Sequence, residues 1–268
     1  MDIDDRYLDV DFTKDPRYVF GALQDVKRKC RSATDAGVTI IPEDKWQELA
    51  ELAEENNAGT EWLVTRIMDQ EQEGSCVGNA TAQIAEQTQA SMLGIENVVP
   101  MSAISMYKQI GSSPGSGAMV DDALEKFKTV GMLPLDTPSN RARFGNHVMP
   151  HTGFYTPWPS GAWKTTAAMF RADEYFVCQS EEELFSCLLQ GIPVVVGREG
   201  HSIAYQTPRW KNGKWIFTYA NSWSLNWGSP LGRMEGGFGF DTLSQFRKSA
   251  YWCFGVTSMV TNNLALAL

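Results

Sequence analysis

The feature that most constrains the fold of this chain is a change in the spacing of its apolar residues. In the first half, apolar and small residues recur every three or four positions, which is typical of helices that bury one face. In the last third they run consecutively or alternate, which is typical of strands. Helices followed by strands predict an α+β protein with a helical lobe, an antiparallel β-sheet or barrel lobe, and a site in the cleft between them.

Capping and turn residues define the predicted elements. Gly94 predicts the end of a helix, and Asn212-Gly213 predicts a hairpin turn. We predict helices over 42–57, 75–93, 101–110, 119–130 and 180–190, a long loop over 135–165, and strands over 192–197, 202–206, 215–220 and 237–240. The predicted domains are an acidic N-terminal extension over 1–60, a helical lobe over 61–140 and a β-rich lobe over 141–268.

Composition and charge exclude several classes of function. The 268 residues are 43% hydrophobic and 21% charged, with a formal net charge of −9, so we predict a globular protein that binds neither nucleic acid nor membrane. Residues 1–60 contain 14 acidic and 8 basic residues, and we interpret them as a propeptide or as an arm that docks a protein partner. The first residues lack the features of a signal peptide, which predicts a cytoplasmic location.

Cys76 is the cysteine best placed for chemistry. It follows Gly74 and Ser75 and begins a predicted helix, with Ser75 as the expected N-cap residue. Unpaired backbone N–H groups and the helix dipole stabilise a thiolate at such a position. The other cysteines form no CxxC pair or disulfide framework, and we interpret them as small structural residues; they are Cys30, Cys178, Cys187 and Cys253.

A nucleophilic thiol needs a group that accepts and returns its proton, and His201 is the best candidate. It opens a predicted strand after the apolar run 193–197, where a rigid sheet would hold it. Asn221 follows another predicted strand and can orient the imidazole, although its aromatic-rich surroundings alone would predict only a loop that covers a core. His147 and His151 lie in the predicted loop without Cys or His partners nearby, so we predict no metal site and no cofactor.

Together these residues resemble the papain-like cysteine peptidases, over about residues 61–260. Gln70 lies six positions before Cys76, as the oxyanion glutamine of that family lies before its nucleophile. The motif 74–76 matches the family's Gly-Ser-Cys, and 221–228 is similar to its Asn-Ser-Trp-Gly…Trp-Gly. The sequence Cys-Val-Gly-Asn-Ala from Cys76 resembles bacterial and bacteriophage branches, which would make the chain an intracellular bacterial or a viral protein.

The resemblance implies the hydrolysis of a polypeptide in the inter-lobe cleft through an acyl-enzyme on Cys76. His201 would act as general base and then as acid for the leaving amine, and Asn221 would orient its imidazole. Gln70 and the Cys76 N–H would form the oxyanion hole, and Trp223 would shield the His–Asn contact from water. We assign substrate binding to Gly74, Ser75, Gly117, Ala118, Gly200 and Trp223.

Two features run against this assignment. Asp69, Glu71 and Glu73 lie near the thiol in sequence, and negative charge raises a thiol pKa. A strict two-residue turn at 212–213 also places Asn221 opposite Ala204, about 10 Å along the strand from His201. The triad therefore requires a slip, a bulge or a longer loop, and an irregularity near Pro208 would fit because proline cannot donate to a strand ladder.

Other functions remain open on the sequence alone. A catalytically silent protein on the same fold would use the cleft or the acidic arm as a docking surface, for example as a component of a bacteriophage virion. A cell-wall amidase would also use a cysteine and a histidine. The order of Gln70, Cys76, His201 and Asn221 favours the peptidase.

Overall fold

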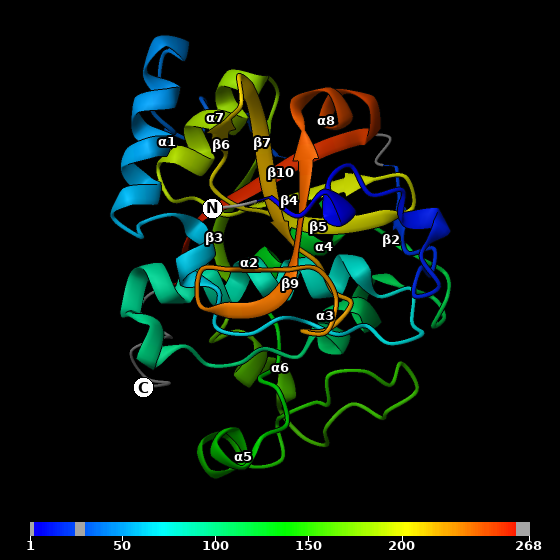
Figure 1. Ribbon diagram of the computed structural model, residues 1–268. Helices are drawn as coiled ribbons and strands as arrows, with labels where there is room; N and C mark the ends of the chain where they lie inside the picture. Colours follow the sequence, from blue (N-terminus) through cyan, green and yellow to red (C-terminus); the bar gives the residue numbers. More distant parts are fainter. Residues whose placement is uncertain (1–2, 25–29, 261–268) are drawn as a thin grey trace.

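The structure is a computed structural model that describes residues 3–24 and 30–260, so parts of the predicted domains 1–60 and 141–268 lie outside it. A helical lobe packs against a lobe built on one large antiparallel sheet (Figure 1), which confirms the predicted α+β class. The helices are α1 Trp46–Glu55, α2 Cys76–Leu93, α3 Ala103–Ile110, α4 Val120–Thr129, α5 Pro138–Phe144, α6 Trp163–Ala167, α7 Glu181–Leu189 and α8 Leu243–Ser249. The short 3₁₀ helices are η1 Asp5–Tyr7, η2 Phe12–Lys14, η3 Glu43–Lys45, η4 Thr60–Leu63 and η5 Ile95–Asn97. The strands are β1 Ala22–Leu23, β2 Ala118–Met119, β3 Ala172–Cys178, β4 Val194–Arg198, β5 His201–Tyr205, β6 Arg209–Lys211, β7 Lys214–Ala220, β8 Ser229–Leu231, β9 Met234–Thr242 and β10 Ala250–Met259.

The large sheet forms the β-rich lobe. Its strand order is β3-β10-β4-β5-β7-β9-β8, with β6 attached to β7. Helix α1 packs against α7 and β6, and α8 packs against β7, β9 and β10. A second sheet pairs β1 in parallel with β2, and it joins the N-terminal segment to the helical lobe.

Helix α2 is the central element of the helical lobe and lies between helices α3 and α4 and the large sheet (Figure 1). Every residue over 76–90 is buried, because α3 and α4 pack on α2 from one side and β5, β4 and β10 from the other. Small residues such as Ala82 and Ala85 allow this close approach. Gly94, with φ of 87°, ends the helix as predicted. The start of α2 is therefore held firmly between the two lobes.

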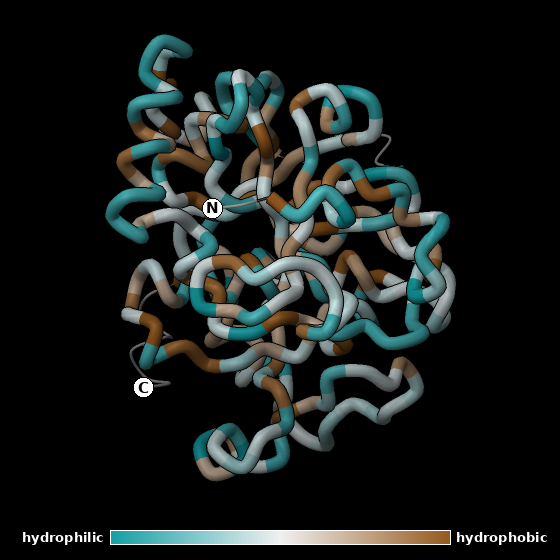
Figure 2. The backbone as a smooth tube through the Cα atoms, in the orientation of Figure 1, coloured by the Kyte–Doolittle hydropathy of each residue, from teal (hydrophilic) through white to brown (hydrophobic). Residues whose placement is uncertain are grey.

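Residues 31–60 pack into the β-rich lobe. Trp46 is 4% exposed and stacks on Phe185 of α7, with ring centroids 4.0 Å apart. The Ala33 N–H donates to Val177 O of β3 at 2.9 Å. Figure 2 shows hydrophilic residues along the outer side of α1, with hydrophobic residues toward the body of the molecule. This part of the N-terminal extension shares the core of the lobe.

A register slip occurs in the hairpin that carries the predicted histidine and asparagine. Asn212-Gly213 form the predicted turn, with φ of 50° and 75°. The pairing of β6 with β7 follows that turn without a shift, but farther along Ala204 lies opposite Ala220 rather than opposite Asn221. The extra residue is accommodated at Thr207-Pro208, in line with the predicted irregularity near that proline.

Several parts of the chain differ from the prediction. Residues 135–165 contain α5 and the start of α6 rather than only a loop; Thr137 caps α5 by accepting a hydrogen bond from the Asn140 N–H, and Pro138 follows at the first helical position. Helix α8 and strands β1, β2, β3, β6, β8 and β10 were not predicted. Strands β3 and β10 contain runs that are buried on both faces, so their apolar residues do not alternate.

Candidate active site

Cys76 lies at the start of α2, fully buried, between the two lobes. Burial raises the pKa of its thiol to about 12, while the backbone amides of Ser202, Val77 and Cys76 itself act in the opposite direction. Ser75 occupies the N-cap position but does not cap the helix with its side chain; its Oγ accepts a hydrogen bond from Asn79 Nδ2 at 3.1 Å instead. The amides at the start of the helix therefore stay free to face the sulfur.

The register slip brings the side chains of His201 and Asn221 into contact. The slip places Asn221 on the continuation of β7 opposite Ile203, two positions from His201 and on the same face of the sheet. His201 Nε2 lies 2.8 Å from Asn221 Oδ1, which also accepts the Ser222 N–H at 2.8 Å. Because that oxygen only accepts, His201 carries its proton on Nε2.

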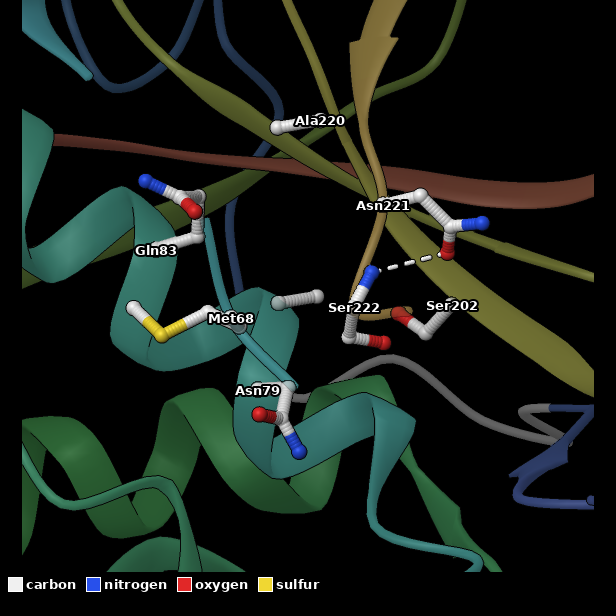
Figure 3. Close-up of a pocket in the computed structure, with 8 residues that line it drawn as sticks. Met68, Asn79, Gln83, Ser202, Ala220, Asn221 and Ser222 are labelled. Carbon is white, nitrogen blue, oxygen red and sulfur yellow. Dashed lines mark hydrogen bonds between the residues drawn. The ribbon is translucent and has the colours of Figure 1, made fainter. Parts of the chain in front are cut away.

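Asn221 borders a small gap beside α2 (Figure 3). Asn221, Ser222 and Ser202 line it from the β-rich lobe, and Asn79 and Gln83 line it from the helix. The dashed line in Figure 3 marks the bond from the Ser222 N–H that fixes the Asn221 amide. Asn221 is thus oriented by backbone as well as by the imidazole.

The thiol and the imidazole are not hydrogen-bonded to each other. His201 Nδ1 is buried and has no hydrogen-bond partner within 3–24 and 30–260. Burial lowers the pKa of His201 to about 4; the Asn221 contact opposes this shift and the Arg198 charge adds to it. With the pKa values of Cys76 and His201 displaced in these directions, both groups are neutral near pH 7. Cys76 and His201 therefore form a neutral thiol and a neutral imidazole rather than a thiolate–imidazolium pair.

The lowered pKa of His201 predicts a loss of stability in acid. In the unfolded state this histidine has a pKa near 6.5 and is protonated below that pH. In the folded state it is protonated only below about pH 4. Stability should therefore fall as the pH drops from about 6.5 toward 4, by about 2 kcal/mol at pH 5 from this group. When the pH is lowered from 7 to 5, the Tm of His201→Gln should fall by about 5 °C less than the Tm of the wild type.

The control for this pH dependence is His147→Gln, which changes a half-buried histidine whose Nδ1 contacts Thr166 Oγ1 at 3.0 Å outside the cleft. The Tm of His147→Gln should fall by as much as that of the wild type between pH 7 and pH 5. An equal fall in the Tm of the wild type and of His201→Gln would contradict the assignment of this pH dependence to His201.

The N-terminal segment 12–23, which we call the strap, lies over Cys76 and His201, where the inter-lobe cleft was predicted. Figure 1 shows it beside β5 and β2. Gly21 N and Ala22 N both donate to Gly200 O, at 2.8 and 3.0 Å, and Gly21 O accepts from Ala118 N at 2.8 Å. A Cβ placed on Gly21 would lie only 2.5 Å from Cys76 Sγ. The strap backbone therefore covers the thiol directly.

The strap contacts most of the residues to which we assigned substrate binding. Gly200 and Ala118 hydrogen-bond to it, and a Cβ on Gly117 would lie 3.1 Å from its carbonyl at Gly21. A Cβ on Gly74 would lie 2.5 Å from Phe20 O, and Trp223 contacts Phe12, with ring centroids 5.4 Å apart. Ser75 instead binds Asn79. The strap thus occupies the space that the prediction gave to the substrate.

Gln70 is buried beside the same cleft. Its Oε1 accepts the Ser222 hydroxyl at 2.6 Å, and its Nε2 donates to Glu73 O at 2.8 Å. An amide nitrogen has a second N–H, so the bond to Glu73 leaves one donor for an oxyanion. The Trp223 ring packs at 5.0 Å from the His201 ring, as a shield of the His–Asn contact would.

Two of the carboxylates near Cys76 in sequence, Asp69 and Glu73, accept hydrogen bonds from backbone N–H groups. Asp69 Oδ1 accepts the Glu71 N–H at 3.0 Å. Glu73 Oε1 accepts the N–H groups of Gly153 and Phe154, at 3.1 and 2.8 Å, and so holds the 150s loop. The pKa shift of Cys76 arises from burial and backbone amides.

The two remaining histidines have structural partners. His151 Nε2 accepts the Asp69 N–H at 2.9 Å, and His147 Nδ1 contacts Thr166 Oγ1. Within the described ranges, no group of three or more His, Cys, Asp or Glu side chains is arranged to hold a metal. None of the helices within those ranges has the length and apolar character of a membrane span.

Sequence reasoning missed three residues that shape this site. Phe12 packs edge-on against the His201 ring at 4.6 Å, Gly21 covers Cys76, and Arg198 lies under the Phe12 ring at 4.8 Å. Phe12 and Gly21 lie far before the motif in sequence, with no periodic pattern around them. The one available signal was a glycine between apolar residues in an otherwise acidic segment.

The fold is that of solved papain-like cysteine proteases. Xylellain, a cysteine protease from Xylella fastidiosa, matches with a TM-score of 0.60 and 16% identity, covering 90% of this chain and 97% of xylellain. Procathepsin B S9 of Trypanosoma congolense matches with a TM-score of 0.61 and 14% identity, covering 94% and 89%. Procathepsin L 3 of Tenebrio molitor matches with a TM-score of 0.58 and 14% identity, covering 89% and 77%.

These likenesses confirm the predicted papain-like fold. No protein-family model matches the chain, and no curated protein matches it either. The three structures give no support to a bacteriophage or virion role, which stays a prediction.

Proposed function

We propose that the chain is a papain-like cysteine peptidase that its own strap holds in a latent state. The observation that carries the proposal is that Cys76 Sγ, at a helix start, lies under Gly21 in the same cleft as the 2.8 Å His201–Asn221 pair. The fold is shared with xylellain, which is described as a cysteine protease, and with two procathepsins. A polypeptide is the proposed substrate, because the strap already shows how a peptide backbone fits the cleft.

Catalysis would begin once the strap has left the thiol. His201 Nδ1, which has no hydrogen-bond partner among the described residues, would take the Cys76 proton, and the thiolate would attack the peptide carbonyl carbon. The C–N bond breaks as His201 returns the proton to the leaving amine, and water then hydrolyses the thioester. Asn221 holds the imidazole through Nε2, and Gln70 with the Cys76 N–H would stabilise the oxyanion.

The test is cleavage of unfolded casein by the full chain carrying Gly21→Val, a substitution that displaces the strap. We expect cleavage, and a loss of at least about 10³-fold when Cys76→Ala is added. The matched control is Cys30→Ala in the same background, which should keep the activity.

Two other results would contradict the peptidase proposal and favour a different function. Clearing of bacterial cell walls without cleavage of casein would assign the site to a cell-wall amidase. Failure to cleave either substrate would leave a silent papain-fold protein with a docking role. The acidic outer face of α1, which exposes Glu48, Glu51 and Glu55, would then be the first surface to test for a protein partner.

A further inference from the structure

Phe12 of the strap fills a pocket next to the proposed general base. Its ring contacts His201 at 4.6 Å, Trp223 at 5.4 Å and Tyr219 at 5.9 Å between ring centroids, in edge-on arrangements. The Arg198 guanidinium carbon lies 4.8 Å from the Phe12 centroid. Phe12 is 2% exposed, so the pocket encloses the ring almost completely. We call these four surrounding residues the Phe12 pocket.

Arg198 lines one side of the Phe12 pocket with a buried positive charge. Its side chain is fully buried in β4, and its Nη1 pairs with Asp241 Oδ2, an oxygen that also accepts the Tyr205 hydroxyl at 2.7 Å. Arg198 Nε and Nη2 are buried and have no hydrogen-bond partner among the residues that the structure describes. A desolvated cation of this kind attracts the face of an aromatic ring, and Phe12 now supplies that ring.

The position of the pocket relates it to one side of the scissile bond. A general acid must lie within hydrogen-bond reach of the leaving nitrogen, so the leaving residue lies beside His201. Along the strap, Phe12 contacts His201, Gly21 covers Cys76, and Ala22 and Leu23 pair with β2. The residue that follows the scissile bond is therefore the substrate residue nearest to the Phe12 pocket.

We propose that the Phe12 pocket selects phenylalanine or tyrosine immediately after the scissile bond, and that Arg198 determines this preference. The inference rests on the proposed peptidase function. The strap would exclude such substrates by placing its own Phe12 in the pocket. In the active enzyme the same contacts would hold the leaving residue, with its amine beside His201.

Acyl transfer to an added amine tests this pocket directly. The enzyme is the full chain with Gly21→Val and Phe12→Ala, which displaces the strap and empties the pocket, and the substrate is a peptide thioester. The amine nitrogen attacks the thioester that forms on Cys76, a C–N bond forms, the C–S bond breaks, and the amine proton returns to the sulfur through His201. Phenylalanine amide should capture the acyl group about tenfold better than alanine amide.

Changes at Arg198 and at position 12 separate this role from simple burial. Arg198→Met with Asp241→Leu replaces the buried ion pair together, and it should reduce the preference for phenylalanine amide to less than about threefold. If that variant does not fold, a series at position 12 in the otherwise wild-type chain gives the same information. Phe12→Tyr should keep Cys76 protected from iodoacetamide, Phe12→Leu should protect it less, and Phe12→Ala should protect it least.

The outcomes distinguish the inference from the function on which it rests. Equal capture of the two amides by an enzyme that forms the acyl thioester would overturn the inference and leave the peptidase in place. Equal protection by leucine and tyrosine at position 12 would overturn it as well. Failure to form any thioester on Cys76 would overturn the peptidase proposal and the inference with it.

Discussion

Replacement of Gly21 by valine should switch on the Cys76 thiol. A Cβ at this position would lie 2.5 Å from Cys76 Sγ and 2.7 Å from the backbone oxygen of Gly74, so the strap must move away. A thiol with a pKa of about 12 is a thiolate in only about one molecule in 10⁵ at pH 7. Cysteines paired with histidine at a helix start have pKa values of roughly 3.5–7.5. Alkylation of Cys76 at pH 7 should therefore accelerate by at least about 100-fold.

The matched control is Gly115→Val. A Cβ on that exposed glycine meets no atom within 4 Å, so the strap should stay in place and the labelling rate should match the wild type. Cleavage of casein should rise in the same order as labelling. If Gly21→Val folds but labels no faster than Gly115→Val, the strap does not hold the site in its latent state.

Loss of the Trp46 side chain should destabilise the protein without activating it. Trp46 is 4% exposed and stacks on Phe185 in the core of the β-rich lobe, whereas the strap lies in the cleft. Trp46→Ala should therefore cost about 3–5 kcal/mol in the free energy of unfolding, measured by chemical denaturation. Leu52 lies on the same helix and is 52% exposed, so Leu52→Ala should change it by less than about 0.5 kcal/mol.

This contrast divides the acidic N-terminal extension into two parts. Thr60, at the predicted boundary, is buried; its N–H donates to Thr207 Oγ1, and its oxygen accepts from Gln87 Nε2, both at 2.9 Å. Cleavage there would have to break this core, so we expect that only the strap is displaced on activation. Equal free energies of unfolding for Trp46→Ala and Leu52→Ala would show instead that the packing of residues 31–60 is dispensable for the stability of the protein.

The sequence was informative where one local feature determines the outcome. The helix start at Cys76 and the strand start at His201 follow from local spacing, and both are where the prediction placed them. The contact of His201 with Asn221 was harder to predict, because it depends on one extra residue at Thr207-Pro208. Proline indicated where the ladder breaks, but not by how many residues.

The strap could not be predicted because its contacts are set by tertiary structure. Gly21 and Phe12 lie more than fifty positions before Cys76, and each acts through the shape of a cleft that forms only when both lobes are assembled. In the sequence, Arg198 only follows the apolar run 193–197, in a predicted turn. Its buried ion pair with Asp241 joins β4 to β9, which lie apart in the strand order.

The measurement that tests the central claim most directly is the pH profile of Cys76 alkylation in Gly21→Val, with and without His201→Ala. Iodoacetamide would be applied from pH 5 to pH 9, and the label on each cysteine mapped by mass spectrometry. We predict selective labelling of Cys76 below pH 7, which His201→Ala abolishes, because the imidazolium stabilises the thiolate. Labelling of Cys76 that rises only near the pKa of a free thiol, about 8.5, and is the same in both variants would contradict a peptidase held latent by its strap.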